Sequence, residues 1–350
     1  MEISEFVSVS GYEKVRQCFD EKTGLRSIIA VHNTALGNAL GGTRLWPYEN
    51  ELQALKDVLR LSEGMTRKAA MANLNAGGGK GVIIASQDQK TKGLLEAYAE
   101  FVNSFEGLFS TGEDVGISAE DVKTMRKKTS HIFGLHDPSP FTASGVFHGI
   151  KRCAKHVYGS DNLEGRVIAI QGLGHVGSNL ASLLWMEKAD LIVTDIDKGP
   201  VENAMDGLNA TAVAPSKIFS VECDIFVPCA LGSILNSETI PQLKCRIVAG
   251  AANNQLAEEK HGYELLKKGI LHAPDYIINA GGLIYVYMEK EEDPIRWMDI
   301  QRKIRKIADT LEEVITASEK SNEPPQVTAD RLADREIRRA INAQDRSLWI

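Results

Sequence analysis

Basic residues do not outnumber acidic ones in this chain. Lysine and arginine total 40 against 47 aspartates and glutamates, which gives a formal net charge of −7. Proteins that bind nucleic acid through electrostatics normally carry a basic excess or a basic stripe. The charge therefore predicts no nucleic-acid partner.

Cysteine is also scarce. The five cysteines of the 350 residues are odd in number and contain no C-x-x-C pair, and the eight histidines form no H-E-x-x-H motif. Such spacings are typical of zinc sites and of structural disulfides. We expect reduced cysteines that serve in packing, and no metal.

Long apolar runs are absent as well. No stretch approaches the roughly 18 residues of a membrane span, and the first residues carry acidic side chains where a secretory signal needs basic ones. We expect a cytoplasmic protein with no membrane partner.

The first part of the chain alternates strand-like and helix-like segments. Leu25–Val31 and Gly81–Ser86 are rich in β-branched residues, whereas Glu51–Met71 and Lys92–Phe105 carry apolar residues at helical intervals. This alternation predicts an α/β domain built around a sheet.

A turn-rich segment at 134–140 predicts a domain boundary, followed by a helix at 142–157. Strands predicted at 166–170, 191–193, 225–227 and 247–249 are then separated by helical stretches, as in a doubly wound parallel sheet. The charged segment 300–321 predicts a long surface helix, and a last helix begins near Thr328. The expected fold is α/β with two domains and a cleft between them: residues 1–134 plus 328–350 form a catalytic domain, and residues 135–327 form a Rossmann-type domain.

One glycine motif predicts dinucleotide binding. Gly172-Leu-Gly174-His-Val-Gly177 follows a predicted strand and opens a predicted helix. Alone, G-x-G-x-x-G is weak evidence and can be a chance turn, but the strand–turn–helix order is the one that pyrophosphate binding requires. Gly172 allows the tight turn, Gly174 allows the phosphates to approach, and Gly177 allows close helix packing.

The next predicted strand ends at Asp195, 18 residues after Gly177. An acid near this point accepts hydrogen bonds from the adenosine ribose and repels a 2′-phosphate, which favours NAD over NADP. Asp197 is close enough to compete, but we interpret it as a loop residue.

Three segments combine glycine with ionisable residues, at Lys68, Lys80 and Asp114. A single lysine is usually a solvated surface residue. Lys80 differs because three glycines precede it and an apolar strand follows, which would hold it rigid and partly desolvated beside a ligand. Desolvation and a neighbouring cation, for which Lys68 is the candidate, both lower a lysine pKa towards the range useful for acid–base chemistry.

The segment Leu74–Val82 closely resembles the active-site signature of the glutamate/leucine/phenylalanine/valine dehydrogenase family. The resemblance covers nearly the whole chain, and leucine dehydrogenases look like the nearest branch, with phenylalanine and tryptophan dehydrogenases also close. The other segments that carry it are Gly41–Arg44, Gly64–Thr66, Gly112–Asp114, Pro228–Gly232, Gly250–Gln255 and Asn279–Gly282.

The resemblance implies a role for each matching residue. Lys68 would hold the substrate α-carboxylate, Lys80 would polarise the developing carbonyl and manage the attacking water, and Asp114 would move protons to and from the amino group. The implied substrate-binding residues are Lys68, Met65, Gly41, Leu40, Gly112, Leu283 and Val286. The implied NAD-binding residues are Gly172, Gly174, His175, Val176, Gly177, Asp195, Thr142, Asn253 and Asn279.

The expected substrate has an apolar side chain. Glutamate-specific relatives place a lysine and a serine where this chain has Leu40 and Val286, and an apolar lining would leave a second carboxylate unpaired at a cost of several kcal/mol. Gly112 is often alanine in branched-chain enzymes and glycine in aromatic-specific ones, so the two classes stay open.

The sequence thus predicts a homo-oligomeric enzyme that reversibly deaminates a leucine-, valine- or isoleucine-type L-amino acid to the 2-oxo acid and ammonia, with NAD as oxidant. A phenylalanine or tryptophan dehydrogenase is the alternative, as is a non-catalytic NAD-binding protein, against which the presence of Lys68, Lys80 and Asp114 argues. The oligomeric order, from dimer to octamer, and the effect of the short 134–140 segment stay open.

Overall fold

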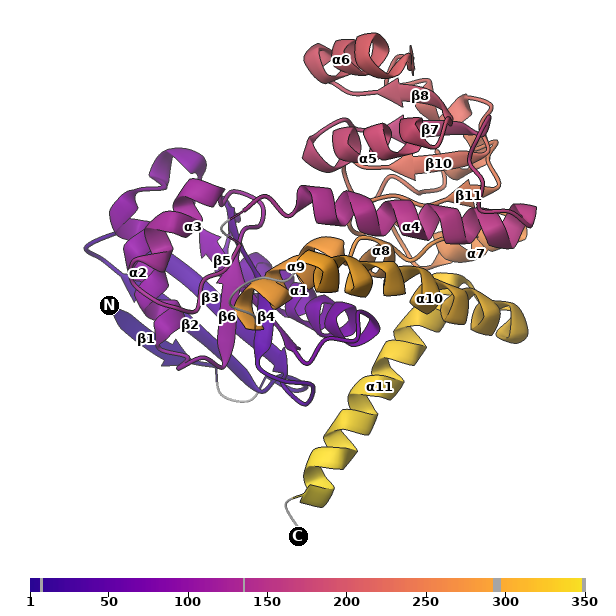
Figure 1. Cartoon of the computed structure of the whole chain (residues 1–350). Helices are drawn as coiled ribbons and strands as arrows, with labels where there is room; N and C mark the ends of the chain where they lie inside the picture. The colour runs from indigo at the N-terminus through magenta and orange to yellow at the C-terminus, as the bar shows by residue number, and fades with distance from the viewer. Residues whose placement is uncertain (7–8, 135, 292–296, 348–350) are drawn as a thin grey trace. The chain divides into compact units, whose positions relative to one another are not determined.

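The chain is divided into two compact units (Figure 1). The computed structural model describes residues 1–6, 9–134, 136–291 and 297–347. Unit 1 comprises Met1–Asp137, Val286–Ile295 and Ala333–Ile350, and unit 2 comprises Pro138–Tyr285 and Arg296–Leu332. The predicted division differs mainly at 286–295, which joins unit 1. Residue 135, inside the predicted boundary segment, and residues 348–350 lie outside the described part of the chain, and the predicted domain roles stay predictions.

Unit 1 contains a six-stranded mixed sheet in the part of the chain that the structure describes. Strands β1, β2, β3 and β5 pair antiparallel in that order, whereas β4 pairs parallel to both β5 and β6. The strands are β1 (Glu2–Glu5), β2 (Lys14–Asp20), β3 (Leu25–Asn33), β4 (Ala39–Trp46), β5 (Gly77–Ile84) and β6 (Phe109–Gly112).

Helices cover both faces of this sheet. Helix α1 (Glu51–Met71) begins where the Asn50 side chain accepts a hydrogen bond from the Gln53 backbone N–H, and it packs Ala54 and Val58 against Val82. Helix α2 (Lys92–Asn103) packs on the opposite face, because alternate residues of β3 enter two different apolar clusters. The helix α3 (Ala119–Arg126) and the short 3-10 helix η1 (Gln87–Gln89) complete this part.

Strand β5 differs from its prediction: it begins at Gly77 and ends at Ile84, whereas we expected 81–86. The glycines belong to the strand because neighbouring elements fill the space where side chains would be. A Cβ at Gly78 would collide with Thr66 of α1, and one at Gly79 would lie 2.6 Å from the Phe109 ring. Gly78 therefore brings helix and sheet together and Gly79 makes room for Phe109 of β6, while the approach of these glycines to a ligand stays a prediction.

Unit 2 contains a six-stranded sheet, again counted over described residues, in the order β12-β11-β10-β7-β8-β9. All its pairs are parallel, which confirms the doubly wound prediction. The strands are β7 (Val167–Gln171), β8 (Asp190–Thr194), β9 (Thr211–Ala212), β10 (Ile225–Pro228), β11 (Ile247–Val248) and β12 (Leu271–His272).

The helices of unit 2 lie before, between and after its strands. They are α4 (Ser139–Tyr158), α5 (His175–Met186), α6 (Lys198–Leu208), η2 (Ile218–Ser220), η3 (Ile240–Gln242), α7 (Lys260–Lys267), α8 (Asp275–Ile278) and α10 (Trp297–Ser321). Helix α10 is more buried than the predicted surface helix, because Ile307 and Leu311 pack against Gly145 and Gly149 of α4.

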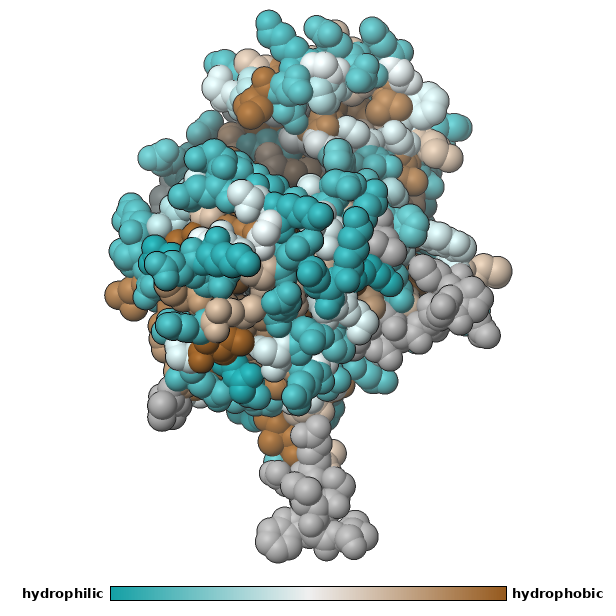
Figure 2. All heavy atoms as spheres, turned by 90° about the vertical axis from the view of Figure 1, so that its left-hand side faces the viewer, coloured by the Kyte–Doolittle hydropathy of each residue, from teal (hydrophilic) through white to brown (hydrophobic). Residues whose placement is uncertain are grey.

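The unit boundary falls inside two helices. Helix α9 (Gly281–Glu291) changes unit after Tyr285, and α11 (Pro325–Ser347), which begins three residues before the predicted Thr328, changes unit after Leu332. Within unit 1, Asp334 of α11 pairs with Arg67 of α1 at 3.0 Å. Hydrophilic side chains predominate on the face drawn in Figure 2, with hydrophobic ones in small patches. Among the helices of the described residues, none combines the length and apolar character that crossing a bilayer needs.

The tight contact at Gly78 gives a stability test. Gly78→Ala places a methyl group against the α1 backbone, and we expect a loss of at least about 2 kcal/mol of unfolding free energy. The matched control is Gly93→Ala in α2, where the new methyl would meet only ordinary contacts. Thermal unfolding of both variants checks this, and equal midpoints for the two would contradict it.

Candidate active site

An ion pair between a buried lysine and a half-buried aspartate lies in unit 1. Along β5, Lys80 lies on the same face of the strand as Gly78 and Val82, whose positions face α1. Its Nζ lies 3.1 Å from Asp114 Oδ2. The Lys80 side chain is 6% exposed and that of Asp114 23%. The structure thus brings together the two residues expected to be catalytic.

Asp114 reaches this place from the loop after β6. Gly42 of the neighbouring strand β4 leaves room for it, because a Cβ at Gly42 would lie 2.9 Å from the Asp114 Cβ. The backbone of Asp114 also bridges to Ile117, which fixes the loop. Sequence-distant strands therefore position the lysine and the aspartate on one side of one sheet.

Arg44 is a member of this cluster that we did not predict as a site residue. Its Nε lies 3.1 Å from the same Asp114 Oδ2 that Lys80 contacts, and its Nη1 lies 2.9 Å from Asp57 of α1. Tyr48 donates a hydrogen bond to Asp57 at 2.7 Å. Arg44 is the last residue of the Gly41–Arg44 motif. It stands two residues after Gly42 on β4 and so shares a strand face with it, which is the sequence signal that could have predicted it.

The two cations set the protonation state of Asp114. Burial alone would raise the pKa of this carboxyl, but the charges of Lys80 and Arg44 and their hydrogen bonds outweigh burial and hold the pKa below its ordinary value. The pKa of Asp57 is likewise lowered: burial opposes this, but hydrogen bonds from Tyr48 and Arg60 and the charge of Arg44 prevail. Both groups are carboxylates at neutral pH.

Two of the predicted substrate-binding residues, Gly41 and Met65, are neighbours in unit 1. A Cβ at Gly41 would press on the Gly79 carbonyl oxygen and would lie 3.4 Å from Met65 Cγ. Lys68, one turn after Met65 in the last turn of α1, is half-buried. The structure shows the Asp114 carboxylate as the ionic partner of Lys80. That Lys68 is the neighbouring cation that lowers the Lys80 pKa stays a prediction.

The predicted side-chain pocket is divided between the units. Leu40, Gly112 and Val286 belong to unit 1, and Leu283 belongs to unit 2. Leu40 is 2% exposed and has the burial of a core residue. A Cβ at Gly112 would lie 2.6 Å from the Phe133 carbonyl oxygen. Packing therefore accounts for glycine at 112, and this position does not by itself favour a large substrate.

In unit 2, the glycine turn has the geometry that dinucleotide binding requires. Gly172 has φ +99°, and a Cβ at Gly177 would collide with the Gly172 carbonyl. A Cβ at Gly174 would meet no protein atom within 4 Å, which leaves open space at the start of α5. His175 and Val176 form the first turn of α5, whose free N–H groups favour phosphate.

Asp195 follows β8 at the edge of this turn. Its carboxylate accepts hydrogen bonds from the backbone N–H of Leu173 at 2.6 Å and of Asp197 at 2.9 Å. The Asp197 side chain instead caps α6 by accepting from Gly199 N–H at 3.1 Å. Asp195 is thus the acid beside the turn, and Asp197 has a structural role.

The three remaining predicted cofactor residues, Thr142, Asn253 and Asn279, lie in unit 2. Asn279 donates a hydrogen bond to Asn253 Oδ1 at 2.7 Å and to the Ala251 carbonyl at 3.0 Å. Thr142, in the first turn of α4, lies beside Gly282, where a Cβ would be 2.7 Å from its Oγ1. The two asparagines fix one another's orientation.

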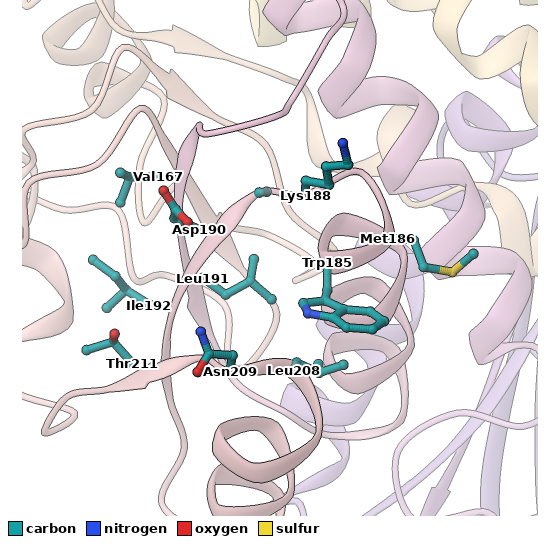
Figure 3. A pocket seen from close by; sticks show the side chains of 11 residues that line it. Val167, Trp185, Met186, Lys188, Asp190, Leu191, Ile192, Leu208, Asn209 and Thr211 are labelled. Atoms are coloured by element: carbon teal, nitrogen blue, oxygen red, sulfur yellow. The ribbon is translucent and has the colours of Figure 1, made fainter.

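A separate cavity of about 840 Å³ lies in unit 2 at the opposite edge of the sheet (Figure 3). It lies at the amino ends of β7 and β8, whereas the glycine turn and Asp195 follow their carboxyl ends. It contains no predicted site residue, and its lining is Val167, Trp185, Met186, Lys188, Ala189, Asp190, Leu191, Ile192, Leu208, Asn209 and Thr211. The described residues contain no cluster of three or more histidine, cysteine or acidic residues suited to a metal ion.

The chain belongs to the glutamate/leucine/phenylalanine/valine dehydrogenase family. The model of the family's dimerisation domain matches residues 13–136, and a second family model matches residues 186–345. The protein is therefore an oxidoreductase, an amino-acid dehydrogenase of a family that uses NAD or NADP.

Comparisons with individual proteins give high identity over nearly full length. The chain is 45% identical to leucine dehydrogenase from Geobacillus stearothermophilus, over 96% of this chain and 94% of that one. It is 45% identical to L-tryptophan dehydrogenase from Nostoc punctiforme, over 99% of each. The crystal structure of the Nostoc enzyme superimposes with a TM-score of 0.85 and 46% identity, over 95% of this chain and 97% of that one.

The charge cluster predicts a pH-dependent stability. Arg44→Met removes one of two cations at Asp114, and we expect a loss of about 1–3 kcal/mol of unfolding free energy at pH 7. Because the folded pKa of Asp114 is lowered, the pairing stabilises the fold above the unfolded pKa of about 4. This stabilisation disappears as the pH falls through the lower, folded pKa.

Urea unfolding of wild type and Arg44→Met from pH 7 to pH 3 measures this. The deficit of the variant should shrink below about pH 4. The control is Arg26→Met, which breaks an exposed pair with Glu51 and should cost less than about 1 kcal/mol. A deficit of the Arg44 variant that stays constant to pH 3 would rule out the electrostatic origin.

Proposed function

We propose that this protein catalyses the reversible, NAD-dependent oxidative deamination of an apolar L-amino acid, of the leucine, valine or isoleucine type, to the 2-oxo acid and ammonia. The observation that carries the proposal is the buried Lys80–Asp114 pair, in a chain that belongs to an amino-acid dehydrogenase family. A binding-only protein has no need of a desolvated lysine and carboxylate in contact.

In this mechanism, Lys68 binds the substrate α-carboxylate and, with Gly41 and Met65, fixes the orientation of Cα. Asp114, a carboxylate because of Lys80 and Arg44, accepts a proton from the substrate ammonium group. When bound, NAD would supply the hydride acceptor for the hydrogen on Cα, and loss of that hydride leaves an imine. Water then adds to the imine carbon, and Lys80 donates a hydrogen bond to the oxygen that water brings to Cα, which stabilises the developing charge. The C–N bond breaks as ammonia leaves. The products are the 2-oxo acid and ammonia.

The glycine turn fits the cofactor's pyrophosphate. The open space at Gly174 and the N-terminus of α5 suit two phosphates, and Thr142, Asn253 and Asn279 are the polar groups for the nicotinamide carboxamide. Asp195 supports NAD over NADP, because its carboxylate would accept hydrogen bonds from the ribose hydroxyls and repel a 2′-phosphate.

The second candidate is an aromatic amino-acid dehydrogenase. It is favoured by the likeness to the tryptophan dehydrogenase, which equals the likeness to the leucine dehydrogenase in identity. Leu40 and Val286 suit either side chain and oppose glutamate.

We further propose a homo-oligomer, because residues 13–136 match a model described as a dimerisation domain. Its order, and the cytoplasmic location expected from the sequence, stay predictions.

A substrate panel tests the proposed reaction. NADH formation at equal concentrations of leucine, valine, phenylalanine, tryptophan and glutamate should be fastest with leucine or valine. Faster turnover of phenylalanine or tryptophan would favour the second candidate, turnover of glutamate would contradict the apolar pocket, and no turnover of any would favour a binding-only protein. Repeating the panel with NADP should give slower rates.

Lys80→Ala tests the catalytic pair. We expect turnover to fall by at least about 100-fold, while NADH binding, followed by its fluorescence, survives because the nucleotide residues lie in unit 2. Lys92→Ala is the control, since Lys92 is an exposed lysine of unit 1 with 75% of its side chain accessible; its turnover should be unchanged. Normal turnover in Lys80→Ala would refute the mechanism.

A further inference from the structure

Two cysteines lie opposite one another at the amino edge of the unit 2 sheet. Cys223 stands two residues before β10 and Cys245 two residues before β11, and these strands pair in parallel with Ile225 opposite Ile247. The pairing extends toward the cysteines, because the Asp224 carbonyl accepts hydrogen bonds from the N–H groups of Arg246 and Ile247 at 3.1 and 3.3 Å. The register therefore aligns Cys223 with Cys245.

The two side chains also meet. Both pack into the same apolar cluster, with Phe226 and Val248, and each thiol shifts the pKa of the other. Neighbouring strands lie about 4.8 Å apart, which is inside the range of about 4.4–6.8 Å between Cα atoms that a disulfide spans. Both cysteines are reduced in this structure.

The contact makes the pair chemically distinct from the other cysteines. The hydrogen bond from the Cys223 thiol lowers the pKa of Cys245, although burial opposes this. By contrast, burial raises the pKa of Cys18 to about 11 and that of Cys153 and Cys229 to about 12. Cys245 is 4% exposed, and its partner Cys223 is half-buried. Cys223 is thus the more accessible thiol of the pair, and Cys245 is the one whose pKa lies below its ordinary value.

We propose that Cys223 and Cys245 form a peroxide-oxidisable dithiol that closes to a reversible disulfide between the amino ends of β10 and β11. The Cys245 thiolate attacks one oxygen of a hydroperoxide, the O–O bond breaks, and the leaving hydroxide or alkoxide takes up a proton, which leaves a sulfenic acid. The Cys223 sulfur then attacks Cys245 Sγ, the S–O bond breaks and water leaves with the Cys223 proton. Two thiols and one peroxide give one disulfide and, for hydrogen peroxide, two waters.

This site is separate from the proposed catalytic one. The pair lies at the amino ends of its strands, whereas the predicted nucleotide-binding Asn253 follows the carboxyl end of β11. The new bond would tie together the segment between the cysteines, which reduces the freedom of the unfolded chain. We expect the oxidised protein to unfold at a higher temperature than the reduced one.

The test treats the full-length native chain with hydrogen peroxide, unfolds it in guanidinium chloride, blocks free thiols with N-ethylmaleimide and maps tryptic peptides by mass. The expected product has three blocked thiols of the five and a disulfide between residues 218–244 and Cys245, cleaved by dithiothreitol. Because Cys229 shares the peptide 218–244 with Cys223, Cys229→Ser is the matched control and should keep the cross-link. Cys223→Ser should lose it.

Three outcomes would overturn the proposal. The first is that all five thiols still react after peroxide treatment. The second is a cross-link that persists in Cys223→Ser. The third is conversion of the cysteines to sulfinic or sulfonic acids without formation of a disulfide. Since the decisive peptide comes from the wild-type chain, a variant that fails to fold leaves the test intact.

Discussion

The burial of one ammonium group against one carboxylate is the constraint on which unit 1 depends. Lys80 is almost inaccessible to solvent, and an unpaired charge at that depth would be costly. Asp114 and Arg44 make the burial tolerable, since both cations contact the same Asp114 oxygen and Asp57 compensates the second cation. Gly42 of β4 leaves the space that the Asp114 side chain occupies in this charge cluster.

The regular elements were predictable to the extent that their signals are local. Helix α1 was predicted at its observed bounds because its apolar positions recur at helical spacing. The parallel sheet of unit 2 followed from repeated strand–helix alternation. Strand β5 was predicted too late because glycine disfavours strands on propensity alone. Its glycines are required by contacts with Thr66 and Phe109, which only the fold reveals.

The candidate site was predictable mainly by resemblance. Spacing and strand context predicted the glycine turn, and the turn has the expected geometry at Gly172, Gly174 and Gly177. No local pattern joins Lys80 to Asp114, since their contact depends on strand order. Arg44 escaped prediction for the same reason. For Gly112, the sequence suggested more than the structure supports. A glycine at this position suggested an aromatic substrate, but a side chain there would collide with the backbone of Phe133, so packing alone explains the glycine.

The division of the chain has a consequence for its synthesis. Unit 1 is assembled from the first 137 residues and from two later segments, the last of which begins at Ala333. Asp334, which pairs with Arg67, is therefore synthesised after every residue of unit 2. Unit 2 can fold as a unit from residues that all precede Ala333. The unit whose synthesis begins first is thus the one that is completed last.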